Sequence, residues 1–263
     1  MEEKLKSEGK CFFCGGMFVK AGINRHLATH LKEKVETGKP GKSFFLKIEP
    51  NKKWVTKPYF LSLWVNGETK MKEIDSFLRD IWLECCGHLS AFNDPKKRRG
   101  GFGWDFFEAM ELMEEGKIKE YEKIMEEDAG EIPMSRKASS ALYKGLVLEY
   151  EYDFGSTTEL TVTVMDEYPI KADKKIVLLS RNEPLKIMCA ICGKVPATQI
   201  CAVCMYEEDA VFCDKCAKKH AKKCEDFANY ASLPVVNSPR MGVCAYEGGI
   251  IDTERDGVFV LKE

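Results

Sequence analysis

The feature that most constrains this chain is a run of cysteines between residues 189 and 224. Three C-x-x-C pairs follow one another there, and a histidine and a cysteine one helical turn apart end the run. Two thiolates separated by two residues can converge on one tetrahedral ion, so zinc is the expected occupant. A redox C-x-x-C motif would account for one pair but not for three pairs and a histidine. The eight expected ligands are Cys189, Cys192, Cys201, Cys204, Cys213, Cys216, His220 and Cys224.

The pairing of these ligands follows from the length of the last segment. If the third pair shared an ion with His220 and Cys224, the four ligands would spread over a helix about 16 Å long, too far for one coordination sphere. We therefore expect a cross-brace, in which the first and third pairs hold one ion and the second pair joins His220 and Cys224. This ligand order resembles the MYND and B-box class of zinc modules. A segment this small and polar would take its folding free energy from the metal.

A second set of expected zinc ligands lies near the N-terminus, in CFFCGGMFVKAGINRHLATH. Cys11 and Cys14 form a knuckle, and His26 and His30 are one helical turn apart, as two-Cys-two-His fingers require. The sequence thus predicts a zinc finger within residues 1–40. Together with the cross-brace, this finger brings the expected number of zinc ions to three.

The finger has little capacity to read a DNA sequence. Counting back from His26 places Val19, Gly22 and Arg25 at the base-contacting positions of such fingers. Of these residues, only Arg25 can bind a base edge with two hydrogen bonds. Because one finger covers about three base pairs, we expect a general contact with nucleic acid or protein rather than sequence-specific recognition.

Between the two zinc-binding regions, residues 41–183 are predicted to form an α+β core. Two of its strand-like runs alternate apolar and polar side chains around a turn, which indicates an antiparallel hairpin. The predicted fold class is therefore an antiparallel sheet with packed helices, flanked by two small zinc-stabilised modules. The second module, with the C-terminal tail, covers residues 184–263. The expected strands cover residues 43–50, 59–65, 146–153, 160–164 and 175–180.

Two helical segments are expected within the core. In residues 71–88, apolar side chains recur at three- and four-residue steps, Thr69 can cap the helix and Gly87 can end it. A strongly acidic segment from residue 104 to about residue 127 is expected to break near Gly116. The apolar stripe of the first helix consists of Ile74, Phe77, Leu78, Ile81, Trp82 and Cys85.

Two stretches of the core resemble the plasmid open-reading-frame-three-like proteins, a family grouped with the TnpR passenger proteins of an insertion element. They are SFLRDIWLECCGHLSAF and YEYDFGSTTELTV. Family members share a helix followed by a short strand, and a Tyr-Asp-Phe-Gly turn between strands. The resemblance implies the same α+β fold for residues 43–183 and implies little about activity. The family pattern continues the turn with an acidic residue, Trp and His, whereas this chain has Ser156, Thr157, Thr158 and Glu159.

Two further features have alternative interpretations. The triplet at residues 153–155 spells the kinase magnesium motif, but without a glycine-rich loop or a catalytic-loop pattern we expect a turn. Cys85, Cys86 and His88 could be metal ligands, with Cys244 as a fourth. Cys85 also belongs to the apolar stripe, and a free cysteine is commonly a small core residue.

Basic side chains gather in two places besides the finger. Both groups could bind phosphate or could be solvated surface. With Arg25, they make up the nucleic-acid contacts that we expect: Lys96, Lys97, Arg98, Arg99, Lys218, Lys219, Lys222 and Lys223.

The composition restricts partners and compartment. A formal net charge of −2 over 263 residues argues against a surface coated in basic groups, so any nucleic-acid contact should be local. No run approaches the roughly 20 apolar residues of a membrane span. The first residues contain no apolar segment typical of a signal peptide, so we expect a cytoplasmic protein with reduced thiols.

Three classes of function remain, and we expect a non-enzymatic zinc protein that binds nucleic acid through the finger and local basic loops. The alternative is a protein–protein adaptor that binds its partner through the cross-braced module. An enzyme is expected least, because side chains fill every coordination position of each ion, and hydrolytic zinc needs an open one. No small-molecule substrate is evident.

Overall fold

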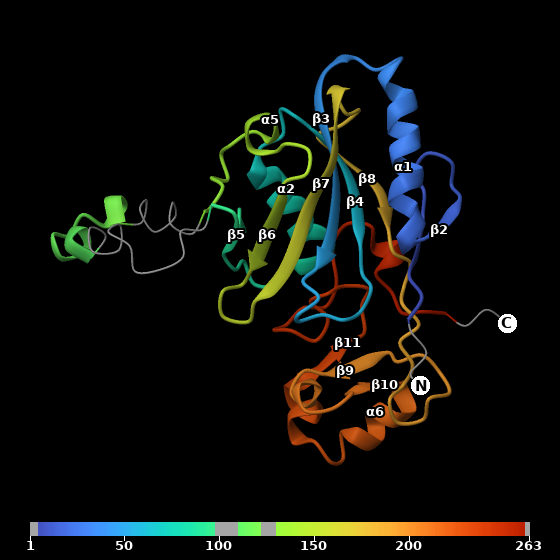
Figure 1. Cartoon of the computed structure of the whole chain (residues 1–263). Coiled ribbons are helices and arrows are strands. Elements are labelled where there is room, and N and C mark those ends of the chain that lie inside the picture. The colour runs from blue at the N-terminus through green and yellow to red at the C-terminus, as the bar shows by residue number, and fades with distance from the viewer. Residues whose placement is uncertain (1–4, 98–109, 122–129, 261–263) are drawn as a thin grey trace.

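A six-stranded antiparallel sheet forms the centre of the molecule (Figure 1). The computed structural model describes residues 5–97, 110–121 and 130–260. The strand order is β5-β6-β7-β3-β4-β8, and every neighbouring pair is antiparallel. The predicted combination of helices with an antiparallel sheet is thereby confirmed. The strands are β3 (Pro40–Pro50), β4 (Leu61–Asn66), β5 (Ser90–Asn93), β6 (Val147–Tyr152), β7 (Thr158–Ile170) and β8 (Ile176–Arg181).

The two faces of the sheet bury different side chains, because successive residues of a strand point to opposite sides. In β3, Phe44 and Leu46 belong to the larger core, whereas Phe45 belongs to the smaller one. The helix α2 (Met71–Leu78) packs on the first face, and α1 (Lys20–Val35) lies along the second (Figure 1). The sheet therefore separates two apolar layers.

The start of α2 differs from the expected cap. Thr69 does not cap the helix, since its hydroxyl donates to the carbonyl of Lys175 at 2.9 Å. Lys70 is the first flanking residue, and its backbone N–H donates to the carboxylate of Glu73 at 2.9 Å. The predicted apolar stripe is confirmed for Ile74 and for the other fully buried members: Leu78, Ile81 and Trp82.

The end of this helical segment also differs from the prediction. After α2 the chain forms a π-helical turn, η1 (Arg79–Leu83), and Glu84 is already extended. Gly87 lies in the following turn with φ 74°, so its conformational freedom serves that turn rather than the helix end. The turn is fixed by the Glu84 carboxylate, which accepts a hydrogen bond from the Gly87 backbone at 2.6 Å.

The strand β5 and the acidic segment are the remaining parts of the core for which prediction and structure can be compared. The short strand β5 was not expected from the hydrophobic pattern, although the family resemblance implied a short strand after the helix, and it pairs with β6 at one edge of the sheet. In the acidic segment, residues 110–114 and 118–121 are helical around Gly116, which has φ 73°, as predicted. The remainder of that predicted segment, residues 104–109 and 122–127, lies outside the described residues.

The C-terminal tail, residues 235–258, packs on the same face of the sheet as α2. Its apolar side chains, such as Met241 and Tyr246, are buried in the larger core. Two fully buried arginines hold the tail: Arg181 in β8 is 2.5 Å from the Asp256 carboxylate, and Arg240 in the tail is 2.6 Å from that of Asp153. The tail is drawn in red in Figure 1.

Smaller elements lie at the two ends of the chain. A small antiparallel sheet precedes α1, and a three-stranded sheet with α6 lies beyond one end of the central sheet (Figure 1). In the part of the chain that the structure describes, no helix has both the length and the apolar character to cross a bilayer. These elements are β1 (Glu8–Lys10), β2 (Met17–Val19), α5 (Ala138–Ala141), β9 (Gln199–Cys201), η2 (Cys204–Tyr206), β10 (Val211–Phe212), α6 (Asp214–His220), η3 (Phe227–Ala231), β11 (Ser232–Pro234) and η4 (Thr253–Arg255).

Candidate metal centres

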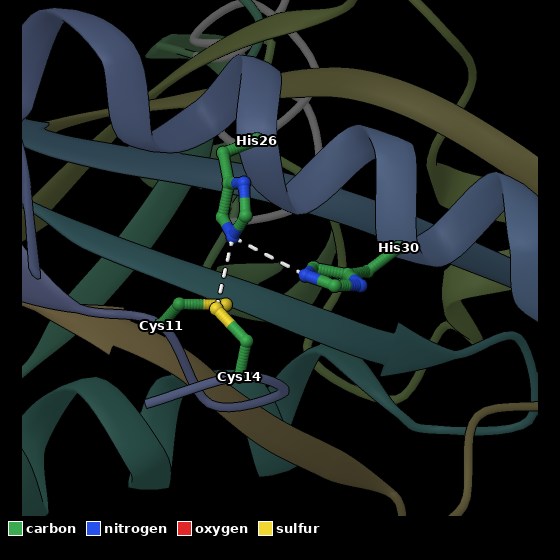
Figure 2. A group of neighbouring side chains, drawn as sticks. All are labelled: Cys11, Cys14, His26 and His30. Atoms are coloured by element: carbon green, nitrogen blue, oxygen red, sulfur yellow. Dashed lines mark hydrogen bonds between the residues drawn. The ribbon is translucent and has the colours of Figure 1, made fainter. Parts of the chain in front are cut away.

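The four expected finger ligands converge between a tight turn and a helix (Figure 2). Cys11 and Cys14 lie in the turn between β1 and β2, while His26 and His30 are one turn apart on α1. The Nε2 atom of His26 is 3.2 Å from the Cys14 sulfur and 3.2 Å from Nε2 of His30. All four ligand atoms lie within 4.8 Å of one another. The ββα order required for a finger is therefore present.

The knuckle also favours a thiolate at one of its two cysteines. A hydrogen bond from the Gly16 backbone, followed by those from the His30 and His26 rings, lowers the pKa of Cys14 to about 6. The pKa of Cys11 is raised, chiefly because that side chain is buried. Since metal ligands must be deprotonated, Cys14 is ready to bind near neutral pH, and a cation is needed to hold the second thiolate beside it.

The helix of the finger is not free-standing. Ile23, Leu27 and Leu31 are fully buried and belong to one cluster with Phe45 and Trp64 of the central sheet. The apolar stripe at four-residue spacing explains this packing, because it lies on a single side of the helix. The zinc-finger prediction did not include packing of these side chains on the central sheet.

The cross-braced module, residues 189–234, brings its eight expected ligands together in the two sets expected from the sequence. Within each set, the four ligand atoms lie within 4.8 Å of one another. Cys213 precedes α6, which carries Cys216 and His220, so one short helix supplies both sets. The sets are Cys189, Cys192, Cys213 and Cys216, and Cys201, Cys204, His220 and Cys224.

The separations are close to the edges of a tetrahedral zinc site. Bonds of about 2.3 Å to sulfur and about 2.0 Å to nitrogen place ligand atoms about 3.3–3.8 Å apart. Cys204 Sγ is 3.6 Å from His220 Nε2 and 3.8 Å from Cys224 Sγ. In the other set, Cys192 Sγ and Cys213 Sγ are 4.0 Å apart. All twelve cysteines of the chain are free, so no disulfide competes for these thiols.

Crowding of thiols shows why these sets need a cation. Burial, followed by the neighbouring thiols of Cys201 and Cys224, raises the pKa of Cys204 to about 12. Burial and the thiols of Cys189 and Cys213 raise that of Cys216 in the same way, also to about 12. The three sulfurs of one set and the four of the other cannot all be charged at these distances without a positive ion between them.

A fourth set of ligand atoms, which the sequence left open, also converges. Cys85, Cys86, His88 and Cys244 lie within 4.8 Å of one another. The fully buried Arg240 next to this set was not singled out from the sequence, because an arginine in a segment without periodicity carries no signal of burial. The described residues thus include four clusters that could hold metal ions.

The structure places Arg25 on the exposed side of α1. It lines a groove of about 770 Å³ between α1 and the sheet, together with Lys20, Lys47 and Glu49. Lys20 and Lys47 are both paired with the Glu49 carboxylate, at 2.7 and 2.6 Å. No ion pair of Arg25 occurs between residues that the structure describes.

The finger knuckle and the basic turn after β5 are not brought together. Lys96 and Lys97 are exposed after β5, whereas β1 of the finger lies beside β8. These strands are the two edges of the sheet, about 24 Å apart at the usual strand spacing, so the finger knuckle and the basic turn cannot clamp one phosphate. Arg98 and Arg99 lie outside the described residues. A separate group of exposed side chains lies on and just after α6: Lys215, Lys218, Lys219, Lys222 and Lys223.

Comparisons with known proteins add little to this geometry. No family model matches the chain, and no curated protein is similar to it. A solved structure with some similarity is a protein of unknown function, MM3350 from Methanosarcina mazei Go1. It is 16% identical, the match covers 53% of this chain and 67% of that chain, and the TM-score is 0.35.

Proposed function

We propose that this protein is a non-enzymatic zinc protein in which three ions stabilise two small modules, the finger and a cross-braced module of the MYND type. The donor chemistry supports zinc, because sets of thiolates and imidazoles at tetrahedral spacing are typical of that ion. Four side-chain ligands per ion leave no open coordination position for hydrolysis. The twelve free cysteines fit a reducing compartment such as the cytoplasm.

The core is proposed to share the fold of the plasmid open-reading-frame-three-like family. Two observations support the relationship. A helical segment, α2 with η1, is followed by the short strand β5, as the family pattern requires. The Asp-Phe-Gly triplet forms the turn between β6 and β7, where the Asp153 carboxylate accepts hydrogen bonds from the backbones of Gly155 and Ser156 at 3.1 and 3.2 Å.

The cross-braced module is proposed to bind nucleic acid through the lysines on and after α6. The observation that carries this proposal is the exposure of five lysines within nine residues, none of which forms an ion pair with another described residue. Because α6 supplies ligands to two metal clusters, metal binding would hold these cations on a rigid helix, which lowers the entropy lost on binding. Tyr206 and Tyr230 are 73% and 69% exposed in the same module and offer faces for base stacking.

A second function is favoured by one different observation. The same module exposes three apolar side chains, Ile191, Val195 and Val203, at 66%, 42% and 41%. Apolar side chains on a rigid module are typical of peptide-binding surfaces. The competing proposal is therefore a protein–protein adaptor that binds an apolar peptide through this module.

Salt dependence separates the two proposals. We expect replacement of the four lysines Lys218, Lys219, Lys222 and Lys223 by alanine to weaken binding to single-stranded DNA or RNA about equally for all sequences, since phosphate contacts carry no base information. The slope of log K against log salt should fall by up to about 3 units on single strands and about 3.5 on duplex DNA. Replacement of the same four lysines by arginine is the matched control and should retain the slope.

Zinc content must remain unchanged in both variants, so that the readout reports charge and not folding. Wild-type protein without affinity for duplex DNA, single-stranded DNA or structured RNA at low salt would rule out the nucleic-acid proposal. Binding of an apolar peptide with little salt dependence would instead support the adaptor.

A further inference from the structure

Four ligand atoms from two distant parts of the chain meet beside the central sheet. Cys85, Cys86 and His88 lie in the loop between η1 and β5, while Cys244 lies in the C-terminal tail, 158 residues after Cys86. We call these four residues the tail cluster. None of them belongs to the finger or to the cross-braced module.

The spacing within the tail cluster fits a tetrahedral ion and does not fit a disulfide. Cys244 Sγ is 3.8 Å from Cys86 Sγ and 3.7 Å from His88 Nε2, close to the edges of about 3.3–3.8 Å expected around zinc. A disulfide would bring two sulfurs to about 2.05 Å. Packing also fails to explain the cluster, because Cys86 and Cys244 are exposed and gain little from burial.

A carboxylate orients the imidazole of the tail cluster. Nδ1 of His88 is 3.5 Å from the Asp153 carboxylate, which leaves Nε2 directed at Cys244. Histidines that bind metals usually place their second ring nitrogen against a carboxylate in this way. The sequence expected only a turn at Asp153, and that turn brings the carboxylate to the ring.

A buried cation supports the thiolates. Arg240 is fully buried, and its guanidinium donates hydrogen bonds to Cys85 Sγ at 3.4 Å and to Asp153 at 2.6 Å. Three thiolates and a neutral histidine around a divalent ion carry a net charge of −1, and the guanidinium lies directly against one of these sulfurs. The same arginine thus touches a ligand and the group that orients another ligand.

The backbone around the tail cluster has an unusual conformation. Cys244 and Asp153 have φ 55° and 66°, in the left-handed region that residues other than glycine seldom adopt. Such conformations persist where the surroundings fix them, and they gather at ligand-binding sites. Here they aim one ligand and one orienting group at the same point.

We propose that the tail cluster binds a fourth zinc ion, which fastens the C-terminal tail to the loop after η1. Three thiolates and one imidazole form a donor set that suits zinc and leaves no open position. The ion would add a link to the hydrogen bonds that already join the tail to this region, such as those of Arg240 to Cys85 and of Ser238 to the carbonyl of Trp82. Its role is therefore to fix the tail rather than to fold a separate module. This proposal does not depend on nucleic-acid binding.

The test is the metal content and the cadmium-113 NMR spectrum of the full-length protein, with zinc or cadmium as the only added metal. We expect four ions per chain in wild type and three in Cys244→Ser. Because the cadmium shift increases with the number of thiolate ligands, the lost signal should come from one of the two three-thiolate sites. Four ions in Cys244→Ser would overturn the proposal.

A matched control is Cys204→Ser, which removes a ligand of the other three-thiolate site. Hydrogen exchange should become faster in residues 237–250 of Cys244→Ser but not of Cys204→Ser. A third measurement uses the wild-type protein alone. Cys86 and Cys244 are exposed, but they should be alkylated slowly in the zinc-loaded protein and rapidly after chelation. Rapid alkylation of both in the presence of zinc would overturn the proposal, as would a Cys86–Cys244 disulfide that persists when zinc and a reductant are both present.

Discussion

A buried arginine, Arg181, binds the C-terminal tail to the sheet. Arg181 is fully buried and binds two tail carboxylates, those of Asp252 and Asp256, as well as the carbonyl of Asn237 at 2.7 Å. Removing one member of a buried pair leaves the other charge without a partner, which is more destabilising than the loss of an exposed pair. Asp252 also pairs with Arg255, which is 24% exposed, so one carboxylate has a buried and a partly exposed partner.

We expect Arg181→Met to lower the free energy of unfolding by about 3–5 kcal/mol, because the Asp256 carboxylate would remain buried without its cation. Arg255→Met is the matched control and should lower it by at most about 1 kcal/mol. Urea denaturation of both variants in saturating zinc would measure the difference. Equal effects of the two substitutions would contradict this account of the tail.

At the scale of elements, α1 has two roles. Two turns of the helix present His26 and His30 to the knuckle, and another side buries its apolar stripe against the sheet. The start of the helix is tied to β3 by Lys20, which pairs with Glu49. The helix that carries two expected metal ligands therefore also packs on the sheet.

This ion pair makes stability depend on pH. Burial raises the pKa of Glu49, but hydrogen bonds from Lys20 and Lys47 lower it below its ordinary value overall. A carboxyl whose pKa is lower in the folded state stabilises the fold above its unfolded pKa, and this contribution is lost as pH falls through the folded pKa. We expect Glu49→Gln to destabilise by about 1–2 kcal/mol at pH 7.

The difference between wild type and Glu49→Gln should shrink toward zero as the pH falls below the ordinary pKa of a glutamate. Comparing the two proteins at each pH cancels effects of acid on the metal sites, which both share. If the difference in the free energy of unfolding stays constant at pH values well below the ordinary pKa of a glutamate, Glu49 acts by packing rather than by charge.

The strands and α2 could be predicted because their periodicity follows from burial on one face. The four-residue strand β5 could not be predicted from periodicity, since it is too short for a pattern and its pairing with β6 depends on contacts far away in the chain. Only the family resemblance implied a short strand there. The metal clusters were predictable where the ligands are close in sequence. The tail cluster was only an open alternative, because Cys244 lies so far from Cys86 along the chain.

Over the whole molecule, the source of stability changes from one region to another. The larger core is built mainly from aliphatic and aromatic side chains of the sheet, α2 and the tail, and it also includes Ala197, Ile200 and Leu233 of the cross-braced module. The core of the cross-braced module is small, and four of its nine buried members are themselves expected ligands: Cys189, Cys201, Cys213 and Cys216. Metal binding should therefore matter most for the module and least for the sheet.

We expect chelation of zinc to remove hydrogen-exchange protection from β9, β10 and α6 while β3, β4 and β7 remain protected. The module loses its metal ions and exposes Phe212 and Phe227, whereas the larger core of the sheet does not contain the ligands of the module. Hydrogen exchange read by mass spectrometry before and after chelation measures both regions in one experiment. Simultaneous loss of protection in both would contradict separate sources of stability.

The placement of β1 has a consequence for association between molecules. Strand β8 is an edge of the central sheet, and an open edge is a template for pairing with another chain. Here the Phe12 backbone donates to the carbonyl of Leu179 at 2.9 Å, and that of Glu183 donates to the carbonyl of Glu8 at 2.8 Å. The N-terminal finger thus occupies the carboxyl-terminal half of this edge, and a closed finger protects the protein from edge-to-edge aggregation.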